Sequence, residues 1–352
     1  MGDYPCSCRV QPLGGMMTVK TALRALARRL PRPVKKQINE GIWMLSSAGR
    51  QYSMLAKDKW RTDASLLPLT EAHRSLYGTI HKLYFKEFGI LPDIVGCQDF
   101  NEKIQWLKLF DQDREIVRCC DKVLVRDRVR ERVGDEHLVR LYQVGRHFSD
   151  LDFDALPDSF VIKANHDNGT VRVVPDKSAI DREDMANWVN SALRRPFGVD
   201  KGEWGYGPIE RRVLAEEMLP FEDGLPPRDY KFYVVEGRVV FMHLISGRGT
   251  YPTEQTVDPS GVEMGLRLHS AFAPGNGFSR PAEWQEMIRV AEAVGAGFKC
   301  VRVDLYLSNR RIYVGEMTFW PKSGLYQGED RKRIGALLDF DRSTFKPLVS
   351  MR

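Results

Sequence analysis

The sequence predicts an α+β fold with antiparallel sheets, and two observations lead to that prediction. Two pairs of strand-like segments are each joined by a short polar turn, as in β-hairpins: 229–235 with 238–245, and 300–307 with 311–318. Apolar residues recur at helical spacing in segments between the strands, namely 71–88, 99–110, 184–193 and 284–294. Because strands that pair in hairpins need no crossover helix, a doubly wound parallel sheet is not expected.

Shorter elements fill the rest of the body. A helix is expected to start near Cys119, with Asp121 as its N-cap, and to end at Gly134. Short strands rich in β-branched and apolar residues are expected at 137–144, 160–163, 170–174 and 213–219. Residues 246–280 contain several glycines and show no clear periodicity, so a long loop is expected there.

Length and composition restrict the class of protein. A chain of 352 residues with 43% hydrophobic and 28% charged residues is ordinary for a globular protein of more than one domain. No apolar run approaches the roughly twenty residues of a membrane helix, and no signal-peptide pattern opens the chain. The six cysteines show neither zinc-ligand spacing nor a disulfide framework. These features favour a cytoplasmic protein with reduced thiols.

Positive charge is concentrated near the N-terminus. Residues 1–61 carry twelve Lys and Arg against three acidic residues, a net +9, which leaves −3 for the rest of a chain of net charge +6. Leucines at helical spacing predict a basic amphipathic helix over 18–30, which either lies on an anionic membrane surface or packs on the protein. In the first case residues 17–36 would contact the inner face of a membrane. No nucleic-acid reader motif accompanies the charge, so no nucleic acid is expected.

The hairpin at 300–318 places two carboxylates on one sheet. Asp304 lies near the middle of its first strand and Glu316 near the end of its second, and strand alternation puts Arg302 on the same face as Asp304. Two such carboxylates repel each other unless a cation lies between them or one stays protonated. Oxygen ligands on a rigid hairpin suit Mg²⁺. The alternative is that both acids are solvated residues on the face of a strand.

Two lysines and a glycine-containing turn precede this hairpin. Lys122 opens a predicted helix, and Lys163 ends a strand just before the polar turn 164–169. Separated ammonium groups suit the oxygens of a polyphosphate. Backbone N–H groups of a turn containing Gly169 can approach a phosphate because glycine has no side chain in the way. Each lysine alone fits a surface residue equally well.

The strand at 213–219 ends in groups that suit an adenine base. A carboxylate of Glu216 or Glu217 can accept from an amino group, and the backbone N–H of Leu219 can donate to the ring. The standard nucleotide-binding motifs are absent from the sequence. It has no P-loop, no G-x-G-x-x-G after a strand, and neither the H-R-D nor the D-F-G motif of protein kinases.

Taken in order, these segments resemble the TupA-like group of ATP-grasp ligases, which is linked to teichuronopeptide and surface-polysaccharide synthesis. The resemblance covers roughly residues 75–335. It is carried by the motifs LPDIVGCQDFNEKIQWLKLFDQD (91–113), CCDKVLVRDRV (119–129), FVIKANHDNGT (160–170), VLAEEML (213–219), RDYKFYV (228–234) and VRVDLY…IYVGEMTFWPKSG (301–324).

The resemblance implies an ATP-grasp fold, in which two α+β subdomains with antiparallel sheets hold a nucleotide between them. Residues 1–60 would be a basic, partly disordered segment with an amphipathic helix, and 61–159 a helical part with a linker. The ATP-grasp core would span 160–335, and 336–352 would be a C-terminal tail.

It also implies roles for single residues. ATP would be bound by two lysines, a turn, a hinge and a ribose acceptor: Lys122, Lys163, Asn168, Gly169, Glu216, Glu217, Leu219 and Asp229. Lys163 and Arg302 would be catalytic, with Arg302 stabilising charge on an acyl phosphate. Asp304 and Glu316 would bind Mg²⁺. Thr318 stands where this superfamily commonly has Asn, and its hydroxyl would be a third ligand.

The implied reaction is ATP- and Mg²⁺-dependent ligation of a carboxylate to an amine, with release of ADP. The carboxylate would be a small molecule or a glycan acid, such as an amino acid or the sugar acid of a surface polysaccharide. Four cations are available to hold it: Arg228, Arg248, Arg302 and Lys322. Two alternatives stay open. One is a non-catalytic nucleotide-binding module; the other is a glycosyltransferase, whose D-x-D motif is matched formally at 111–113 and 152–154.

Overall fold

The computed structural model describes residues 31–220, 227–247, 251–275 and 277–346, and the chain divides into two compact units, Met1–Thr62 and Asp63–Arg352. The described part of the first unit consists of α2 (Arg32–Met44) and most of α3 (Ser47–Leu66). The expected amphipathic helix at 18–30 lies outside the described residues. No described helix is both long and apolar enough to cross a membrane.

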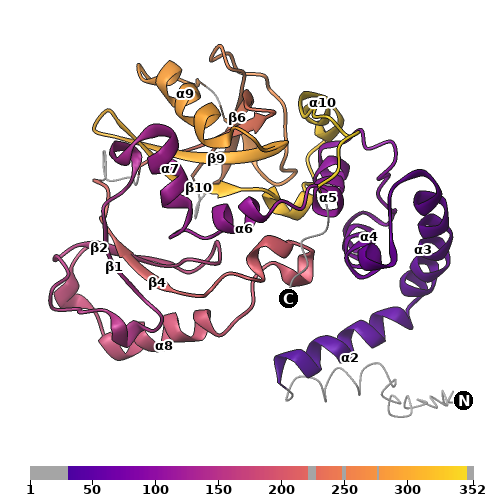
Figure 1. Ribbon diagram of the computed structural model, residues 1–352, viewed down its shortest axis with the longest axis horizontal. Coiled ribbons are helices and arrows are strands. Elements are labelled where there is room, and N and C mark those ends of the chain that lie inside the picture. The colour runs from indigo at the N-terminus through magenta and orange to yellow at the C-terminus, as the bar shows by residue number, and fades with distance from the viewer. Residues whose placement is uncertain (1–30, 221–226, 248–250, 276, 347–352) are drawn as a thin grey trace, which may run out of the picture. The chain divides into compact units, whose positions relative to one another are not determined.

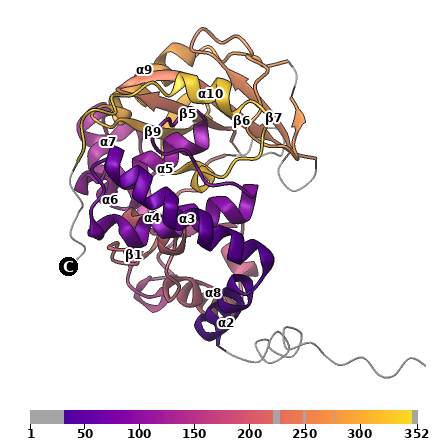
Figure 2. The ribbon, with the colours of Figure 1, turned by 90° about the vertical axis from the view of Figure 1, so that its right-hand side faces the viewer.

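Two sheets form the second unit, which confirms the predicted α+β class (Figures 1 and 2). The first has four antiparallel strands in the order β1-β4-β2-β3, with bounds β1 Leu141–Gly145, β2 Phe160–Ala164, β3 Val171–Val174 and β4 Val213–Glu216. The second has the order β10-β9-β5-β6-β7-β8, with bounds β5 Asp229–Val235, β6 Arg238–Ser246, β7 Thr253–Val257, β8 Ala273–Pro274, β9 Cys300–Ser308 and β10 Arg311–Thr318. Its strands are antiparallel except for the pair β7–β8.

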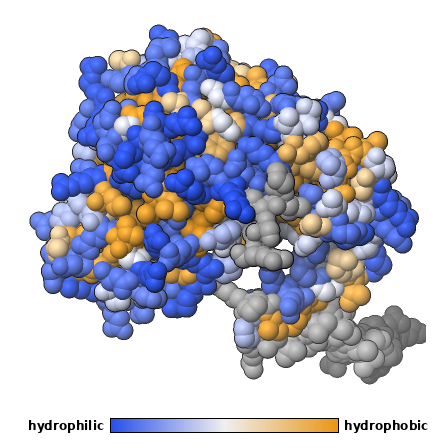
Figure 3. Space-filling model, viewed as in Figure 1, coloured by the Kyte–Doolittle hydropathy of each residue, from blue (hydrophilic) through white to orange (hydrophobic). Residues whose placement is uncertain are grey.

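Helices cover the two sheets and lie between them. Their bounds are α4 Arg74–Phe88, α5 Phe100–Phe110, α6 Arg114–Cys120, α7 Val125–Val133, α8 Arg182–Leu193, α9 Trp284–Gly295 and α10 Arg331–Leu337. Both ribbon views place α6 between the four-stranded and the six-stranded sheet. A hydrophobic band crosses this face of the molecule between the part built on β9 and β10 and the part built on β1 and β4 (Figure 3).

Each sheet has a hydrophobic core on the side that its helix covers. Under α8, Phe160 and Ile162 of β2 pack with Met185 and Val189 of the helix, and all four are buried. Under α9, the apolar residues of β9 are buried in the same way, while its polar residues take the opposite face. The polar faces of the two sheets therefore remain for a site between them.

The two predicted hairpins are confirmed, and their turns have the backbone geometry that short hairpins need. Glu236 and Gly237 between β5 and β6 have φ of 47° and 78°, and Asn309 and Arg310 between β9 and β10 have φ of 49° and 62°. Positive φ at both central residues is the signature of a type I′ turn, which matches the twist of the strands.

Several expected boundaries were wrong. Asp121 does not cap a helix that contains Cys119; α6 ends at Cys120, and the Asp121 carboxylate accepts from the N–H groups of Val123 and Leu124 before α7 begins. Residues 137–140 do not belong to β1, since a short 3-10 turn ends at His137. The expected domain boundary at 159/160 divides a single sheet, because β1 lies before the boundary and pairs with β4, which lies after it.

The region 246–280 contains strand β7, where only a loop was expected. Its sequence TEQTV hides the strand because the inward residues are polar: Glu254 and Thr256 are 3% and 1% exposed. Thr256 donates its hydroxyl to the carbonyl of Leu266 at 2.9 Å, and Glu254 contacts two histidines. Hydrogen bonds to buried partners replace the apolar pattern that marks most strands.

Candidate active site

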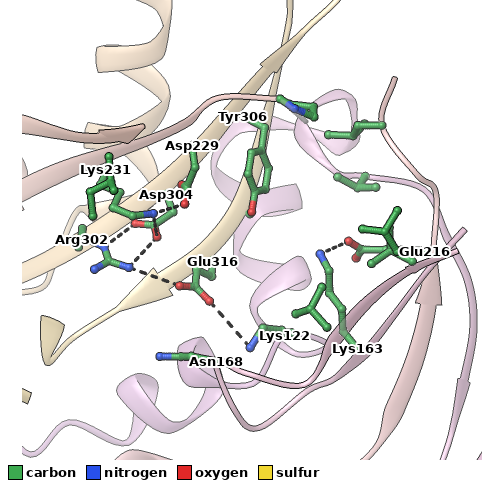
Figure 4. Close-up of a pocket in the computed structure, with 18 of the residues that line it drawn as sticks. Lys122, Lys163, Asn168, Glu216, Asp229, Lys231, Arg302, Asp304, Tyr306 and Glu316 are labelled. Atoms are coloured by element: carbon green, nitrogen blue, oxygen red, sulfur yellow. Dashed lines mark hydrogen bonds and ion pairs between the residues drawn. The ribbon is translucent and has the colours of Figure 1, made fainter. Parts of the chain in front are cut away.

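A cavity of about 560 Å³ is lined by the faces of both sheets that point away from their hydrophobic cores (Figure 4). The four-stranded sheet contributes what we call the β2–β4 wall: Val161, Lys163, Val171, Val173 and Glu216. The six-stranded sheet contributes the β5–β10 wall: Asp229, Lys231, Arg302, Asp304, Tyr306 and Glu316. Strand alternation determines which residues of β2 and β9 face the cavity, because their neighbours along each strand point into the hydrophobic cores.

On the β2–β4 wall, a single ion pair joins Lys163 to Glu216. Their side chains are 16% and 10% exposed, and they come from adjacent strands. The chain beyond β4 continues along the cavity through Glu217 and Leu219. The N–H of Glu217 donates to the carbonyl of Arg140 at 2.8 Å, whereas among the described residues the N–H of Leu219 has no hydrogen-bond partner. Among the described residues the amide of Met218 also has no partner, so the two amides at 218 and 219 can both donate to a ligand in the cavity.

Lys122 connects the turn after β2 to the β5–β10 wall. Its ammonium donates to the carbonyl of Asp167 and lies 3.8 Å from Oε2 of Glu316. Asn168, in the same turn, lines the cavity. Gly169 does not: its N–H donates to the Asp167 carboxylate at 3.3 Å, although the space beside its Cα is open. The expected phosphate contact of the Gly169 amide is therefore not prepared in this structure, because Asp167 already uses that amide.

The β5–β10 wall is a dense network of charges. Arg302 donates through Nε and one Nη to the two oxygens of Asp304, each at 2.6 Å, a bidentate pair. Lys231 donates to Asp304 at 2.9 Å and also contacts Asp229. Arg302 also reaches Glu316 at 3.4 Å. Asp304 is 2% exposed, so the alternative of a solvated strand-face acid is wrong for this residue.

Register brings the two expected metal ligands together. Asp304 and Glu316 are direct cross-strand partners, because a bulge at Gly315 shifts the pairing of β9 and β10 by one residue. A Cβ at Gly315 would lie 2.6 Å from the ring of Tyr306, so only glycine leaves room for that ring at the cavity wall. Tyr306 stands between Asp229 and the Lys163–Glu216 pair in Figure 4.

The charged side chains of the β5–β10 wall shift one another's pKa values. Burial alone would raise the pKa of Asp304, but the charges of Arg302 and Lys231 hold that pKa below its ordinary value. Burial lowers the pKa of Arg302, yet the charge of Asp304 outweighs it and raises the pKa further. Burial and the charge of Asp304 raise the pKa of Asp229. The pair Arg302–Asp304 is thus fully ionised, and Asp229 binds its proton more tightly than an exposed carboxyl does.

A hard divalent cation fits the oxygens of this wall. Among the described residues, the buried Oδ1 of Asp229 has no hydrogen-bond partner, and the partner of Glu316 Oε2 is the ammonium of Lys122 at 3.8 Å. Both carboxylates adjoin Asp304, whose two oxygens already accept from Arg302 and Lys231, so the oxygens open to a cation are those of Asp229 and Glu316. Mg²⁺ binds one or two protein carboxylates together with phosphate oxygens, which suits this donor set.

Two further residues differ from what the sequence suggested. Thr318, the expected third ligand, does not line the cavity: its hydroxyl accepts from Arg302 at 3.1 Å and donates to Glu316 at 3.2 Å. Thr318 therefore holds the Glu316 carboxylate in place by a hydrogen bond. Lys231 was missed, although its place two residues after Asp229 puts it on the same face of β5, opposite Asp304. That spacing was the signal that could have found it.

Lys322 lines the cavity on an unusual turn. Lys322 and Ser323 have φ of 51° and 59°, so two consecutive non-glycine residues lie in the left-handed region. Buried groups of α5 hold the turn: Gln105 and Lys108 donate to the carbonyl of Ser323 at 3.0 and 2.9 Å. Strain kept in place by its surroundings is common at functional sites. Of the other expected substrate cations, Arg228 is exposed and does not line the cavity, and Arg248 lies outside the described residues.

Comparison with known proteins yields one family and several distant structures. A family model described as TupA-like ATPgrasp matches residues 102–338, more than half of the chain. No curated protein matches the sequence.

Solved structures resemble the chain only at low identity. D-alanine–D-alanine ligase from Bacillus anthracis complexed with ATP is 17% identical, with a TM-score of 0.34 over 69% of this chain and 63% of that one. L-amino acid ligase from Bacillus licheniformis is 16% identical, with a TM-score of 0.34 over 59% and 42%. D-cycloserine synthetase DcsG is 14% identical, with a TM-score of 0.36 over 63% and 69%. The chain thus spans 63% of the length of the first of these ligases.

Proposed function

Because this chain belongs to the TupA-like ATP-grasp family, we propose that it is an ATP-dependent ligase that joins a carboxylate to an amine. One observation carries the proposal: a single cavity brings together Lys122, Lys163 and Glu216 on one side and the network around Arg302 and Asp304 on the other. The first set suits the base and phosphates of a nucleotide, and the second suits a reacting carboxylate and its phosphate.

In the first step, a substrate carboxylate oxygen forms a bond to the γ-phosphorus of ATP, and the bond from that phosphorus to the bridging oxygen breaks to release ADP. The ammonium groups of Lys122 and Lys163 neutralise the phosphates, and the Arg302 guanidinium stabilises charge on the acyl phosphate. Glu316 and Asp229 have free oxygens that would hold Mg²⁺ beside Asp304, and the ion would neutralise further phosphate charge. In the second step, the amine forms a bond to the acyl carbon and phosphate leaves.

Contacts in the cavity support assignment of the nucleotide to the β2–β4 wall. Val161 and Leu219 offer apolar surface for a flat base beside the Glu216 carboxylate. A nucleotide phosphate near Lys163 would compete with Glu216 for the ammonium, so binding exchanges one charged partner for another at little net cost. The unpartnered, buried oxygen of Asp229 suits a ribose hydroxyl as well as a cation.

The acid substrate is proposed to be an amino acid or the sugar acid of a surface polysaccharide, and the amine an amino acid. Arg302 and Lys322 line the cavity beyond the lysines and offer cationic partners for such an acid. The glycosyltransferase alternative gains no support, because neither D-x-D segment lines this cavity and Asp111 is 2% exposed beside Lys346.

The experiment is to incubate the full chain with ATP, Mg²⁺ and pools of amino acids and sugar acids, and to measure release of ADP, AMP and phosphate. A ligase of this type releases ADP and phosphate only when both an acid and an amine are present. Release of AMP, or transfer of a sugar from a nucleotide sugar without ATP, would exclude the proposal. Once a pool is active, its members are tested singly.

We also propose that residues 17–36 contact anionic membrane surfaces. This range contains seven Lys and Arg and no acidic residue, and each basic residue near such a surface contributes about 1 kcal/mol before salt screening. The test is sedimentation with anionic vesicles, in which the full chain is compared with a variant carrying glutamine at positions 20, 24, 28 and 29. Equal sedimentation of the two proteins would exclude this contact.

A further inference from the structure

Glu254 is a buried carboxylate that joins two histidines at the edge of the cavity. Its side chain is fully buried, and Oε2 lies 3.0 Å from Nε2 of His243 and 3.0 Å from Nδ1 of His269. It also accepts from the backbone N–H of His269 at 3.0 Å and of Leu268 at 3.3 Å. Backbone donors therefore fix its position, and its charge is directed at the two imidazoles.

The surroundings of His243 determine which nitrogen carries its proton. His243 is fully buried, and within the part of the chain that the structure describes its Nδ1 has no hydrogen-bond partner. A buried N–H without an acceptor is costly, so the proton belongs on Nε2, where it is donated to Glu254. Burial also lowers the pKa of His243 to about 4, which keeps the ring neutral. His243 is therefore a neutral donor, and the charged partner of Glu254 is Arg267, whose Nε lies 3.7 Å from Oε1.

His269 is hydrogen-bonded to the charged Glu254 carboxylate and faces the cavity. With Nδ1–H donated to Glu254, its Nε2 carries a lone pair, and among the described residues this nitrogen has no hydrogen-bond partner. The ring stacks on Phe272 at 4.1 Å and 15°, and the Tyr326 ring meets it edge-on at 4.9 Å. His269 is 16% exposed and lines the cavity. A histidine whose tautomer is set by a buried carboxylate, with its other nitrogen in a cavity, has the arrangement of a general base.

His269 lines the same cavity as Arg302, where the acyl phosphate is proposed to form. Tyr326 contacts His269 and also Tyr233, with the two hydroxyls 3.4 Å apart. Tyr233 is the cross-strand partner of Arg302. His269 is thus connected through two side chains to the residue expected to stabilise the acyl phosphate, and it lies in the same cavity.

We propose that His269 accepts the proton of the amine that attacks the acyl phosphate, and that Glu254 positions His269 for this step. The proposal rests on the proposed ligase function. The amine nitrogen forms a bond to the acyl carbon, the bond from that carbon to the phosphate oxygen breaks, and phosphate leaves with the electron pair. The proton lost by nitrogen goes to Nε2 of His269, and Glu254 stabilises the resulting imidazolium. His269 is then a catalytic residue and Glu254 a positioning residue.

The same three side chains have the composition of a metal site, with ligand atoms within 4.8 Å of one another. The environment of His243 instead favours the hydrogen-bonded pair of Glu254 and His269, without a metal. A metal-bound histidine nearly always donates its other N–H to an acceptor, and Nδ1 of His243 has none. In addition, Oε2 of Glu254 already accepts from both imidazoles and from backbone amides.

Several charged or titratable groups lie around His269. They come from the neighbouring strands, the adjoining loop and the cavity: Glu254, His243, Arg267, Tyr326, Arg302 and Lys322. Of these, Glu254 contacts the His269 ring, and Arg267 donates to the backbone carbonyl of His269 at 3.3 Å. Glu254→Gln removes its charge and keeps its shape, so it should shift the acidic limb of the pH profile of amide formation to lower pH.

The test separates the two chemical steps with hydroxylamine, a nucleophile that is neutral at pH 7 and needs no base. The full chain receives ATP, Mg²⁺ and the amino-acid and sugar-acid pool, and formation of hydroxamate is compared with formation of amide. We expect His269→Gln to form hydroxamate within about twofold of the parent chain and to lose amide formation by about a hundredfold or more. Glu254→Gln should lose amide formation about tenfold and show the shifted pH profile. His147→Gln, at an exposed histidine, should change neither rate.

The outcomes are distinct. If the parent chain forms no hydroxamate with any acid, the ligase function fails and the base role falls with it. If His269→Gln loses hydroxamate and amide equally, the ligase function stands and the base role is wrong. Nitrogen-15 NMR of the histidines provides a readout independent of turnover: His269 should be protonated on Nδ1, and protonation on Nε2 alone would contradict the proposal. One zinc per chain, lost in Glu254→Gln, would show a metal site instead.

Discussion

The two walls of the cavity are built differently, although each presents lysine and carboxylate groups to the same space. On the β2–β4 wall, Lys163 and Glu216 form one pair whose side chains are 16% and 10% exposed. On the β5–β10 wall, Asp304 alone accepts from Arg302 twice and from Lys231, and it is 2% exposed. The first wall can exchange its partners for a ligand, whereas the second is held in place by several mutual hydrogen bonds.

The largest effect should follow from Asp304→Asn. The change leaves Arg302 and Lys231 buried without their common partner, and breaking a buried ion pair from one side costs roughly 3–5 kcal/mol. Denaturant unfolding should therefore show a lower unfolding free energy, and ATP turnover should be lost. The matched control is Glu329→Gln, an exposed acid that should leave the unfolding free energy unchanged. An unfolding free energy for Asp304→Asn equal to that of the parent would mean that the network is not preorganised.

The stability of the body should fall in mildly acidic solution because of His243. Its folded pKa is about 4 against an ordinary 6.5, so the unfolded chain binds the proton first. A group of this kind contributes stability above pH 6.5, and that stability is lost as pH falls toward 4, up to about 3 kcal/mol in all. His243→Asn should flatten the dependence of unfolding free energy on pH within this window. An unchanged slope would show that His243 is not buried as a neutral ring.

Gly315→Ala should affect the β5–β10 wall by an intermediate amount. The added Cβ would lie 2.6 Å from the Tyr306 ring, which must move or push the bulge aside. Overpacking of this type costs about 1–3 kcal/mol. The variant should unfold at lower denaturant and turn over more slowly, because the bulge sets the pairing of Asp304 with Glu316. Gly169→Ala, where the space beside Cα is open, is the control.

The smallest effect on stability should follow from Lys163→Ala. The Glu216 carboxylate that remains faces the cavity, so the loss of its partner should cost less unfolding free energy than Asp304→Asn does. Nucleotide affinity, by contrast, should fall about tenfold, as titration calorimetry with a non-hydrolysable ATP analogue would measure. If Lys163→Ala destabilises the chain as strongly as Asp304→Asn, the contrast between the two walls is not real.

The sequence was informative where the determinants are local. The hairpins were predictable because their polar turns and alternating residues are contiguous, and alternation alone placed Arg302 beside Asp304. The sequence was less informative where contacts between distant segments determine the local structure. The bulge at Gly315 exists because of a ring from another strand, and β7 was hidden because its inward residues are polar. Lys231 was overlooked because its partner, Asp304, is 73 positions away in the chain.

The most direct test of the account is ATP-dependent release of ADP by Glu316→Gln. The substitution keeps the size of the side chain and removes the charge that faces Lys122 and adjoins Asp304. We expect Glu316→Gln to lose acid- and amine-dependent ADP release by about a hundredfold or more while it unfolds at the same denaturant concentration as the parent, because Glu316 is bonded to the network only at its edge. Full turnover by Glu316→Gln would contradict the assignment of this cavity as the active site.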